Sequence, residues 1–439
     1  MRVPSRIPLC LLAITLTRTG MAQQPVPAAD AQARIQQLIE RLTIAEAQIR
    51  ELQQARATGG QLLPAAPTIA AVLPNTSPKT SPIPSPSPTL AAIDTDNDPH
   101  ALMMEIPGGP ALKIRGFFDF NYGVGPNANP LVFPVAPVVH NTFQAGEFDL
   151  FITSKLSNHF DFVSEVVLGP DQTNTFSVDI ERYQLNYRQN EYFEISAGRY
   201  HSAIGYYNTA YHHGDWFQTA TGRPFMYYFE DSGGLLPVHN VGVTANGLVP
   251  GTGAWGLHWT AEGGNGRSSS NTNEPVQNFL SDRSSKSYNF AFYIKPQWAR
   301  GLQAGGSYYH DRLDPAAIPS VNQTIESAYA VFITPSLEFL NEAVLLTNRV
   351  EGENNRFRTP LMYTQVSKKF GIYRPYFRYQ YVNSPAHDPV NIYTDRYQGP
   401  SVGLRIDLAA YVAFKLQYNR LDQRSGSSNG LDSQLAFTF

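Results

Sequence analysis

Hydrophobic and polar residues alternate one by one from about residue 111 to the end of the chain. Over 112–121, apolar Leu112, Ile114, Phe118 and Phe120 take turns with polar or charged neighbours. The same period returns in the stretches 147–153, 255–262, 288–295, 373–381 and 412–419. Because successive side chains of a β-strand point to opposite faces, each stretch predicts a strand with one apolar and one polar face. Most of the chain is therefore predicted to be all-β.

The connections between these predicted strands alternate between short and long. Short turns are expected near 157–158, 189–190, 250–251, 299–300, 335–336, 370–371 and 409–410. Long loops are expected near 123–142, 200–236, 264–286, 312–321, 385–396 and 422–430, with 169–177 and 350–356 as shorter members of the same set. This arrangement gives about sixteen antiparallel strands with all short turns at one end, which is typical of outer-membrane barrels. We expect a transmembrane β-barrel over 106–439.

The sidedness of the strands is left open by alternation alone. In a membrane barrel the apolar face contacts lipid and the polar face surrounds a wet lumen. In a secreted sandwich the apolar face would be a dry core and the polar face would meet water. The alternating loop lengths, and the Tyr and Phe residues at the strand ends, favour the membrane barrel.

The first 22 residues read as a secretory signal peptide. Arg2 and Arg6 precede an apolar run over 7–16, and Gly20-Met21-Ala22 offers small residues for cleavage. The only cysteine, Cys10, lies within this segment. The mature chain is therefore expected to lack disulfides, thiolate metal sites and cysteine nucleophiles.

A coiled-coil helix is predicted over 28–56, followed by a linker over 57–105. Apolar residues recur at alternating spacings of four and three at Ala31, Ile35, Leu38, Leu42, Ala45, Ile49 and Leu52. This is the seam of a short coiled coil, although a lone amphipathic helix would show the same pattern. The linker carries eight prolines between Pro64 and Pro88 among Ser, Thr and Ala, so we assign it no compact fold.

Composition agrees with a barrel. The net charge of −3 gives no reason to expect a nucleic-acid partner. Aromatic residues make up 12% of the chain, and the mean hydropathy is −0.28. Averaging over the two faces of a barrel strand hides its apolar half.

The chain ends in an aromatic strand. Leu435, Phe437 and Phe439 share one face of the last predicted strand. This ending resembles the C-terminal signal that the outer-membrane barrel assembly machinery reads. We therefore count that machinery among the expected partners.

The order of segments resembles that of bacterial general and phosphate-selective-type porins. The run Gly198-Arg199-Tyr200-His201, followed by Ile204-Gly205-Tyr206, resembles the strand end that leads into the third loop of the phosphate-selective type. The resemblance implies a homotrimer in the cell outer membrane, in contact with its lipids, with the coiled coil in the periplasm. It also implies a third loop folded into the pore.

The lumen is the expected functional site, because selectivity in a channel comes from pore width and from the charges around it. By alternation, a basic wall on the first and on the thirteenth to fifteenth strands comprises Lys113, Arg115, Arg374, Arg378, Arg405 and Lys415. An acidic sector on the second and third strands comprises Glu147, Asp149, Asp161 and Glu165. The constriction loop is expected to contribute Arg199, His201, Asp215, Arg223, Glu230 and Asp231. Two alternatives remain: unsegregated lumen charges, and a loop that acts as an external lid.

Three further motifs lack the context that their chemistry needs. His212 and His213 are adjacent, so on an extended chain they point apart. The acidic residues of 94–105 have the spacing of a calcium loop, but Pro99 stands where that loop requires glycine. The run 426–430 spells a nucleophile elbow but lies between two strands. No metal, cofactor or catalytic residue is predicted.

The prediction is a non-enzymatic porin that lets small hydrophilic solutes or ions diffuse through a charged constriction. One alternative is a structural or adhesive barrel whose coiled coil engages the cell wall. Another is an outer-membrane hydrolase.

Overall fold

The computed structural model describes residues 102–104, 109–124, 141–170, 175–211, 214–229, 234–268, 279–315, 318–391 and 396–439. The chain divides into the units Met1–Ser81 and Pro82–Phe439, and all the described residues belong to the second. The predicted signal peptide and coiled coil lie outside the described residues, as does the linker up to residue 101. No helix in the described part of the chain is long and apolar enough to cross a membrane.

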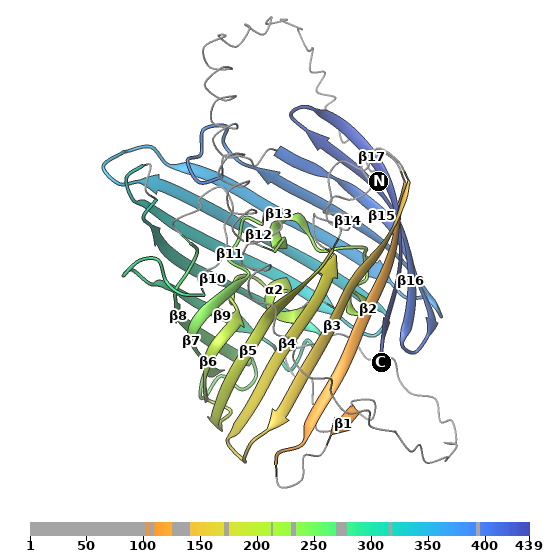
Figure 1. The fold of residues 1–439 in the computed structure, drawn as a ribbon, viewed down its shortest axis with the longest axis horizontal. Helices are drawn as coiled ribbons and strands as arrows, with labels where there is room; N and C mark the ends of the chain where they lie inside the picture. Colours follow the sequence, from red (N-terminus) through yellow and green to blue (C-terminus); the bar gives the residue numbers. More distant parts are fainter. Residues whose placement is uncertain are drawn as a thin grey trace, which may run out of the picture. The chain divides into compact units, whose positions relative to one another are not determined.

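Strands make up most of the described structure (Figure 1). They are β1 (Leu102–Met104), β2 (Leu112–Val124), β3 (Thr142–Lys155), β4 (Phe160–Pro170), β5 (Phe176–Asn190), β6 (Phe193–His201), β7 (His239–Leu248), β8 (Leu257–Gly264), β9 (Ser287–Ile294), β10 (Leu302–Leu313), β11 (Val321–Ile333), β12 (Leu337–Val350), β13 (Phe357–Lys368), β14 (Tyr373–Asn383), β15 (Arg396–Ala409), β16 (Val412–Gln423) and β17 (Gly426–Thr438). Three short helical turns lie between β6 and β7: α2 (Tyr207–Ala210), η2 (Asp215–Phe217) and η3 (Phe225–Tyr227).

The strands close into a barrel. Each strand from β2 to β17 pairs antiparallel with the next, and β17 pairs with β2 from Leu431↔Val124 to Thr438↔Phe117. Of the 17 strands, only the short β1 lies outside this ring, which leaves sixteen. The predicted antiparallel barrel of about sixteen strands is therefore confirmed.

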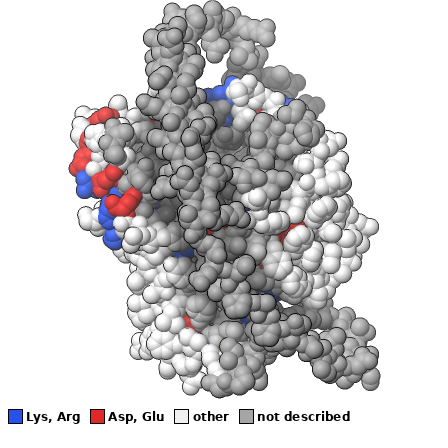
Figure 2. All heavy atoms as spheres, in the orientation of Figure 1, with Lys and Arg blue, Asp and Glu red and all other residues white. Residues whose placement is uncertain are grey.

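The outer face of the barrel is apolar. Large apolar side chains at outward positions are exposed, among them Phe290 at 51%, Val402 at 53% and Leu416 at 42%. Figure 2 shows that charged side chains gather at one rim of the visible face, while most of the visible wall is uncharged. So much exposed apolar surface is stable only in an apolar environment. The alternation of apolar and polar residues is therefore that of a barrel whose outer face contacts lipid.

The C-terminal strand β17 closes the barrel by pairing with β2. The last residue, Phe439, extends the β17–β2 ladder, because its backbone N–H donates to Gly116 O at 2.9 Å and its carbonyl accepts from Gly116 N at 2.8 Å. A Cβ at Gly116 would lie 2.3 Å from the Phe439 ring, so glycine leaves the room that the ring occupies. Beyond this point β1 pairs with Leu112–Ile114 of β2. This short strand lies in the last residues of the segment predicted to be linker.

The connections agree with the predicted alternation except at the last hairpin. All seven predicted short turns lie within two residues of a connection between consecutive strands at one end of the barrel, which we call the short-turn end. The turn predicted at 189–190 covers the last two residues of β5, and the chain turns directly after them. The expected long loop at 422–430 is wrong, because β16 continues to Gln423 and β17 begins at Gly426. Small polar residues here continue the strands and pair across the hairpin, as Leu421↔Ser428 and Arg420↔Asn429 show.

Candidate functional site

We call the connection between β6 and β7, residues 202–238, the lumen loop, because its described residues lie inside the barrel. In a ring of sixteen strands, β14 and β15 lie opposite β6 and β7. The backbone N–H of Phe225 donates to Gln380 Oε1 of β14 at 2.7 Å, and Arg405 Nη1 of β15 donates to Trp216 O at 2.6 Å. The described part of the loop therefore crosses the interior to the far wall, and α2 is seen within the ring of strands in Figure 1.

A single carboxylate on β12 fixes the start of the lumen loop. Glu342 accepts hydrogen bonds from the backbone N–H groups of Tyr206 and Tyr207 at 2.6 and 2.9 Å. It also accepts from the hydroxyls of Tyr227 and Tyr363, both at 2.6 Å. Burial and the neighbouring Glu342 raise the pKa of Tyr227, so its hydroxyl stays protonated and donates. The carboxylate thus joins α2, η3 and β13 at one point.

The turn into α2 requires a glycine. Gly205 has φ +75°, a conformation that L side chains rarely adopt. A Cβ there would also lie 1.7 Å from Tyr227 Oη and 2.5 Å from Glu342 Oε2. The close approach of the backbone to Glu342 therefore depends on this residue.

An apolar cluster lies between the lumen loop and the inner face of β10–β14. The loop contributes Ile204, Tyr206, Tyr207, Ala210, Tyr211, Met226, Tyr227, Leu235 and Leu236. The wall contributes Tyr309, Ile325, Val331, Ile333, Leu340, Val344, Leu346, Leu361, Tyr363 and Val382. The rings of Tyr207 and Tyr227 stack with centroids 5.5 Å apart. This part of the inner wall is apolar because it binds the loop.

Three cations of the predicted basic wall hold the lumen loop by its carbonyl groups. Lys415 Nζ donates to Asp215 O at 2.6 Å and to Ala220 O at 3.1 Å. Arg405 donates to Trp216 O and Gln218 O, and Arg378 donates to Gly222 O at 3.0 Å. Lys415 and Arg378 are buried. Because carbonyl oxygens carry partial negative charge, these contacts compensate the cations beneath the loop.

The other basic residues lie on the same inner face. Arg115 on β2 donates to Thr438 Oγ1 at 3.0 Å, and its guanidinium lies 5.5 Å from the Trp216 ring. Lys113 precedes it by two residues on the same face of β2. Arg374, near the short-turn end, donates to Pro335 O at 3.2 Å. The side chains of the predicted basic wall therefore share the inner face of the barrel with the lumen loop.

Asp215 lies at the contact between the lumen loop and the barrel closure. Its side chain accepts a hydrogen bond from Gln434 Nε2 of β17 at 2.6 Å. Burial raises the pKa of Asp215 above its ordinary value, while the nearby Lys415 opposes the shift. The loop therefore carries a carboxyl group that takes up a proton more readily than an exposed aspartate.

The predicted acidic sector lies on the inner face of β3 and β4, and one of its four carboxylates is paired with an arginine. Glu165 is fully buried and forms a 3.0 Å ion pair with Arg182 of β5. Asp161 accepts a hydrogen bond from Asn186 Nδ2 at 2.5 Å. The remaining two residues lie on β3, where Asp149 is buried and Glu147 is half-buried.

The residues predicted for the constriction lie in different places. Arg199 belongs to β6, where its guanidinium pairs with Asp179 and Glu181 of β5 at 3.1 and 3.3 Å. His201 ends β6, and its Nδ1 lies 3.0 Å from Asn208 O. The side chain of Arg223 lies within the lumen loop, 4.1 Å above the ring of Phe229. Glu230, Asp231, His212 and His213 lie outside the described residues.

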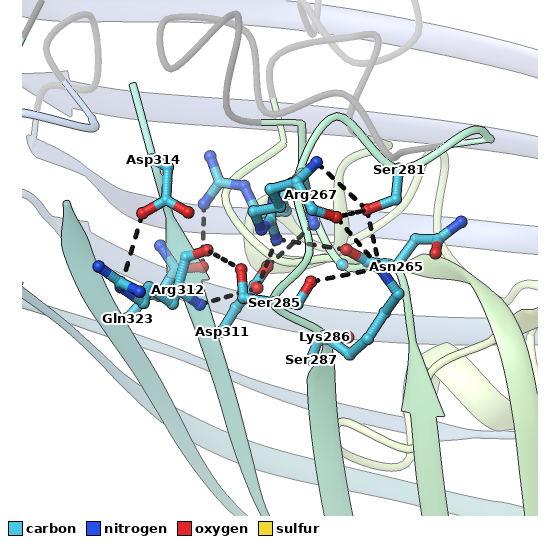
Figure 3. Close-up of polar contacts among 12 residues, drawn as sticks. Asn265, Arg267, Ser281, Ser285, Lys286, Ser287, Asp311, Arg312, Asp314 and Gln323 are labelled. Carbon is cyan, nitrogen blue, oxygen red and sulfur yellow. Dashed lines mark hydrogen bonds and ion pairs between the residues drawn. The ribbon is translucent and has the colours of Figure 1, made fainter. Parts of the chain in front are cut away.

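A polar cluster at the rim of the barrel joins the loop between β8 and β9 to the end of β10 that lies opposite the short-turn end (Figure 3). Asp311 accepts hydrogen bonds from the backbone N–H of Arg267 at 2.9 Å and from Arg283 Nη2 at 2.5 Å. Arg267 Nη1 in turn donates to Gln323 of β11 at 3.2 Å. This cluster fixes the rim of the barrel beside the lumen.

Two adjoining cavities remain beside the lumen loop. The first, of about 300 Å³, is lined by β5–β10 and by the start of the loop, with Gln184, Asn246, Thr260, Glu262 and Tyr206 in its walls. The second, of about 400 Å³, shares Tyr206, Lys295 and Gln303 with the first and continues to the β9–β10 turn. Open space therefore follows the wall that the loop leaves uncovered, toward the short-turn end.

Several interior residues were missed by the sequence prediction, chiefly Glu338, Glu342 and Asp119. Glu338 and Glu342 stand four residues apart on the inner face of β12, among inward apolar residues such as Leu340 and Val344. A strand with apolar residues on both faces and two acids on one is the signal that could have located the loop-binding wall.

Comparisons with known proteins identify the fold. No family model matches the sequence, and no curated protein matches it. Among solved structures, the outer-membrane channel DcaP of Acinetobacter baumannii is 12% identical with a TM-score of 0.53, covering 76% of this chain and 99% of that one. The anion-selective porin from Comamonas acidovorans is 11% identical with a TM-score of 0.52, covering 75% and 100%. OmpT, an outer-membrane protein of Vibrio cholerae in trimer form, is 9% identical with a TM-score of 0.50, covering 75% and 100%. The chain thus has the barrel fold of bacterial outer-membrane porins.

Proposed function

We propose that this chain is an outer-membrane porin through which small hydrophilic solutes or ions diffuse passively. The observation that carries the proposal is the lumen loop, whose described part crosses the interior from β6 to β14 and has two cavities beside it. A barrel with an apolar outer face and a polar inner passage is suited to carry water-soluble molecules across a bilayer. The porin fold of its structural neighbours supports the same function.

The charged residues of the interior would act on solutes at this narrowed section. The basic wall (Lys113, Arg115, Arg374, Arg378, Arg405, Lys415) would set a positive potential behind the loop. Carboxylates on β3, β4 and the loop would set the opposing sign. Charges in a narrow passage with low-dielectric walls focus the field and select among ions.

We further propose that the protein is a homotrimer in the outer membrane, with its predicted coiled coil in the periplasm. A trimeric neighbour of the same fold supports the assembly state. The aromatic C-terminal strand (Leu435, Phe437, Phe439) would be recognised by the barrel assembly machinery, and the coiled coil would be free to contact the cell wall.

Single-channel conductance in planar bilayers tests the channel function. The purified chain should give steady ohmic steps. Replacing residues 206–236 with a short Gly/Ser linker should raise the conductance at least about two-fold, because the main obstruction of the lumen is removed.

The matched control replaces the exposed residues 352–355 between β12 and β13 with the same linker and should leave the conductance unchanged. Absence of conductance steps from the intact protein would refute the porin. An unchanged step size after removal of the lumen loop would refute its role as the constriction.

A further inference from the structure

Of the two cavities described above, the one between the lumen loop and β5–β10 has the more polar lining. We propose that this cavity is a binding site for an uncharged, polyhydroxylated solute of about the size of a monosaccharide. The inference rests on the proposed function, since such a solute would enter along the passage. Its volume of about 300 Å³ lies at the lower end of the range of roughly 300–1,000 Å³ for small-molecule sites.

The charges that line the cavity cancel. Its described lining holds two cations, Arg182 and Lys295, and two anions, Glu194 and Glu262. Arg182 is paired with Glu165 at 3.0 Å, and Glu194 is paired with Arg188 at 2.6 Å. Ion pairs of this kind leave little net field for a charged solute, so a neutral one is favoured.

The anion Glu262 is occupied by the protein itself. Its carboxylate accepts hydrogen bonds from the Ala203 N–H at 2.9 Å and from Asn289 Nδ2 at 2.8 Å. The remaining cation, Lys295, lies with its Nζ 5.2 Å from the Tyr293 ring centroid, within cation–π range. Neither group is placed as a free point charge at the centre of the cavity.

Neutral groups that both donate and accept hydrogen bonds supply the other polar surface. Gln184 and Asn246 are half-buried in the wall, and their amides form no hydrogen bond to another described residue. Thr260 adds a hydroxyl on the strand next to Asn246. A hydroxyl of a sugar is likewise both a donor and an acceptor, so amides and hydroxyls are its matching partners.

Aromatic side chains complete the walls. Tyr206, Tyr293 and Tyr329 line the cavity, and the apolar faces of such rings suit the C–H face of a sugar ring. The hydroxyls of Tyr200 and Tyr206 are buried in the wall and have no hydrogen-bond partner among the described residues. Because buried hydroxyls are normally bonded, these two are further candidates for contact with a bound solute.

Binding of D-glucose and of gluconate to the full-length protein in detergent, measured by isothermal titration calorimetry, tests the proposal. The two probes share a carbon skeleton and differ in charge. Glucose should bind saturably and more tightly than gluconate. Asn246→Leu and Tyr206→Phe should each raise the Kd for glucose roughly three- to ten-fold, the expected loss of one hydrogen bond.

Two substitutions of the same kind elsewhere serve as controls. Asn341→Leu lies on the outer face of β12, and Tyr211→Phe removes a buried, unpartnered hydroxyl of the lumen loop that does not line the cavity. Both should leave the Kd unchanged. Absence of saturable glucose binding, tighter binding of gluconate, or equal effects of the controls would each overturn the proposal. Because calorimetry does not require conduction, failure of the channel function would appear separately, as missing conductance steps.

Discussion

The carboxylate of Glu342 shows how one residue can position a whole segment. It receives two backbone N–H groups and two tyrosine hydroxyls, all from buried residues. Each buried donor that loses its partner costs about 1–3 kcal/mol, more than the hydrogen bond itself contributes. The position of the lumen loop should therefore be sensitive to this single side chain.

We predict that Glu342→Ala destabilises the barrel by about 3 kcal/mol or more, because four donors lose their acceptor together. The measurement is urea-induced unfolding of the protein in detergent, followed by tryptophan fluorescence. Glu351→Ala is the matched control, because Glu351 is exposed and its ion pair with Arg312 should contribute at most about 1 kcal/mol. Equal losses in the two variants would contradict the anchoring role.

Asp215 should make the stability of the folded protein depend on pH. Its folded-state pKa is raised by burial, so the folded protein holds this proton at pH values where the unfolded chain has released it. Its ionisation therefore costs stability above the folded pKa, and the cost disappears as the pH falls toward the ordinary value of 3.8. The sign is opposite to that of a carboxylate stabilised by an ion pair.

We predict that Asp215→Asn raises the midpoint temperature of unfolding at pH 7–8, because the amide removes the buried charge and its oxygen can still accept from Gln434. The gain should shrink as the pH is lowered, since the wild-type carboxyl then becomes neutral as well. Thermal unfolding from pH 8 to pH 4 checks both parts. A variant less stable than wild type at pH 8, or a gain that grows on acidification, would contradict the burial argument.

At the scale of elements, alternation predicted the strands well because a barrel strand has two distinct surroundings. Lys415 and Arg378 were predicted to point inward from their sequence neighbours alone, and in the structure both donate hydrogen bonds to the lumen loop. The partners of these cations could not be predicted. They are backbone carbonyls of a loop far away in the sequence, and periodicity holds no information on where such a loop packs.

The rule that inward residues of a barrel are polar fails at the inner wall of β10–β14. Inward residues such as Ile325, Val344 and Leu361 are apolar and buried, although an aqueous lumen favours polar side chains. The packing of the lumen loop explains them, because the loop turns this wall into a small hydrophobic core. The prediction of a loop at the last hairpin was wrong for a different reason. Gly, Ser and Asn favour turns locally, but pairing with β16 holds Ser427–Gly430 in a strand.

At the scale of the whole barrel, the lumen loop packs on one part of the inner wall and leaves cavities beside it. Its apolar cluster lies against β10–β14, and cations of β15 and β16 bind its carbonyl groups. The first cavity is lined largely by polar residues, and the second also contacts the apolar residues Val331 and Ile333 of the cluster. Solutes that use these cavities are expected to contact both the loop and the barrel wall.

Assembly is the remaining property at this scale, and its prediction rests on the spacing of apolar residues over 28–56. A helix of about three heptads is marginal alone in water and gains stability from partner helices. If three barrels bring three such helices together, the high local concentration should favour the coiled coil, and the coiled coil should in turn stabilise the trimer.

Deleting 28–56 should therefore lower the temperature at which the trimer dissociates, as followed by heating in mild detergent and native electrophoresis. The matched control deletes 64–88 from the predicted linker, which shortens the chain but keeps the helix, and should leave that temperature nearly unchanged. Equal trimer stability in the intact protein and in the variant without 28–56 would show that the barrels associate without help from the coiled coil.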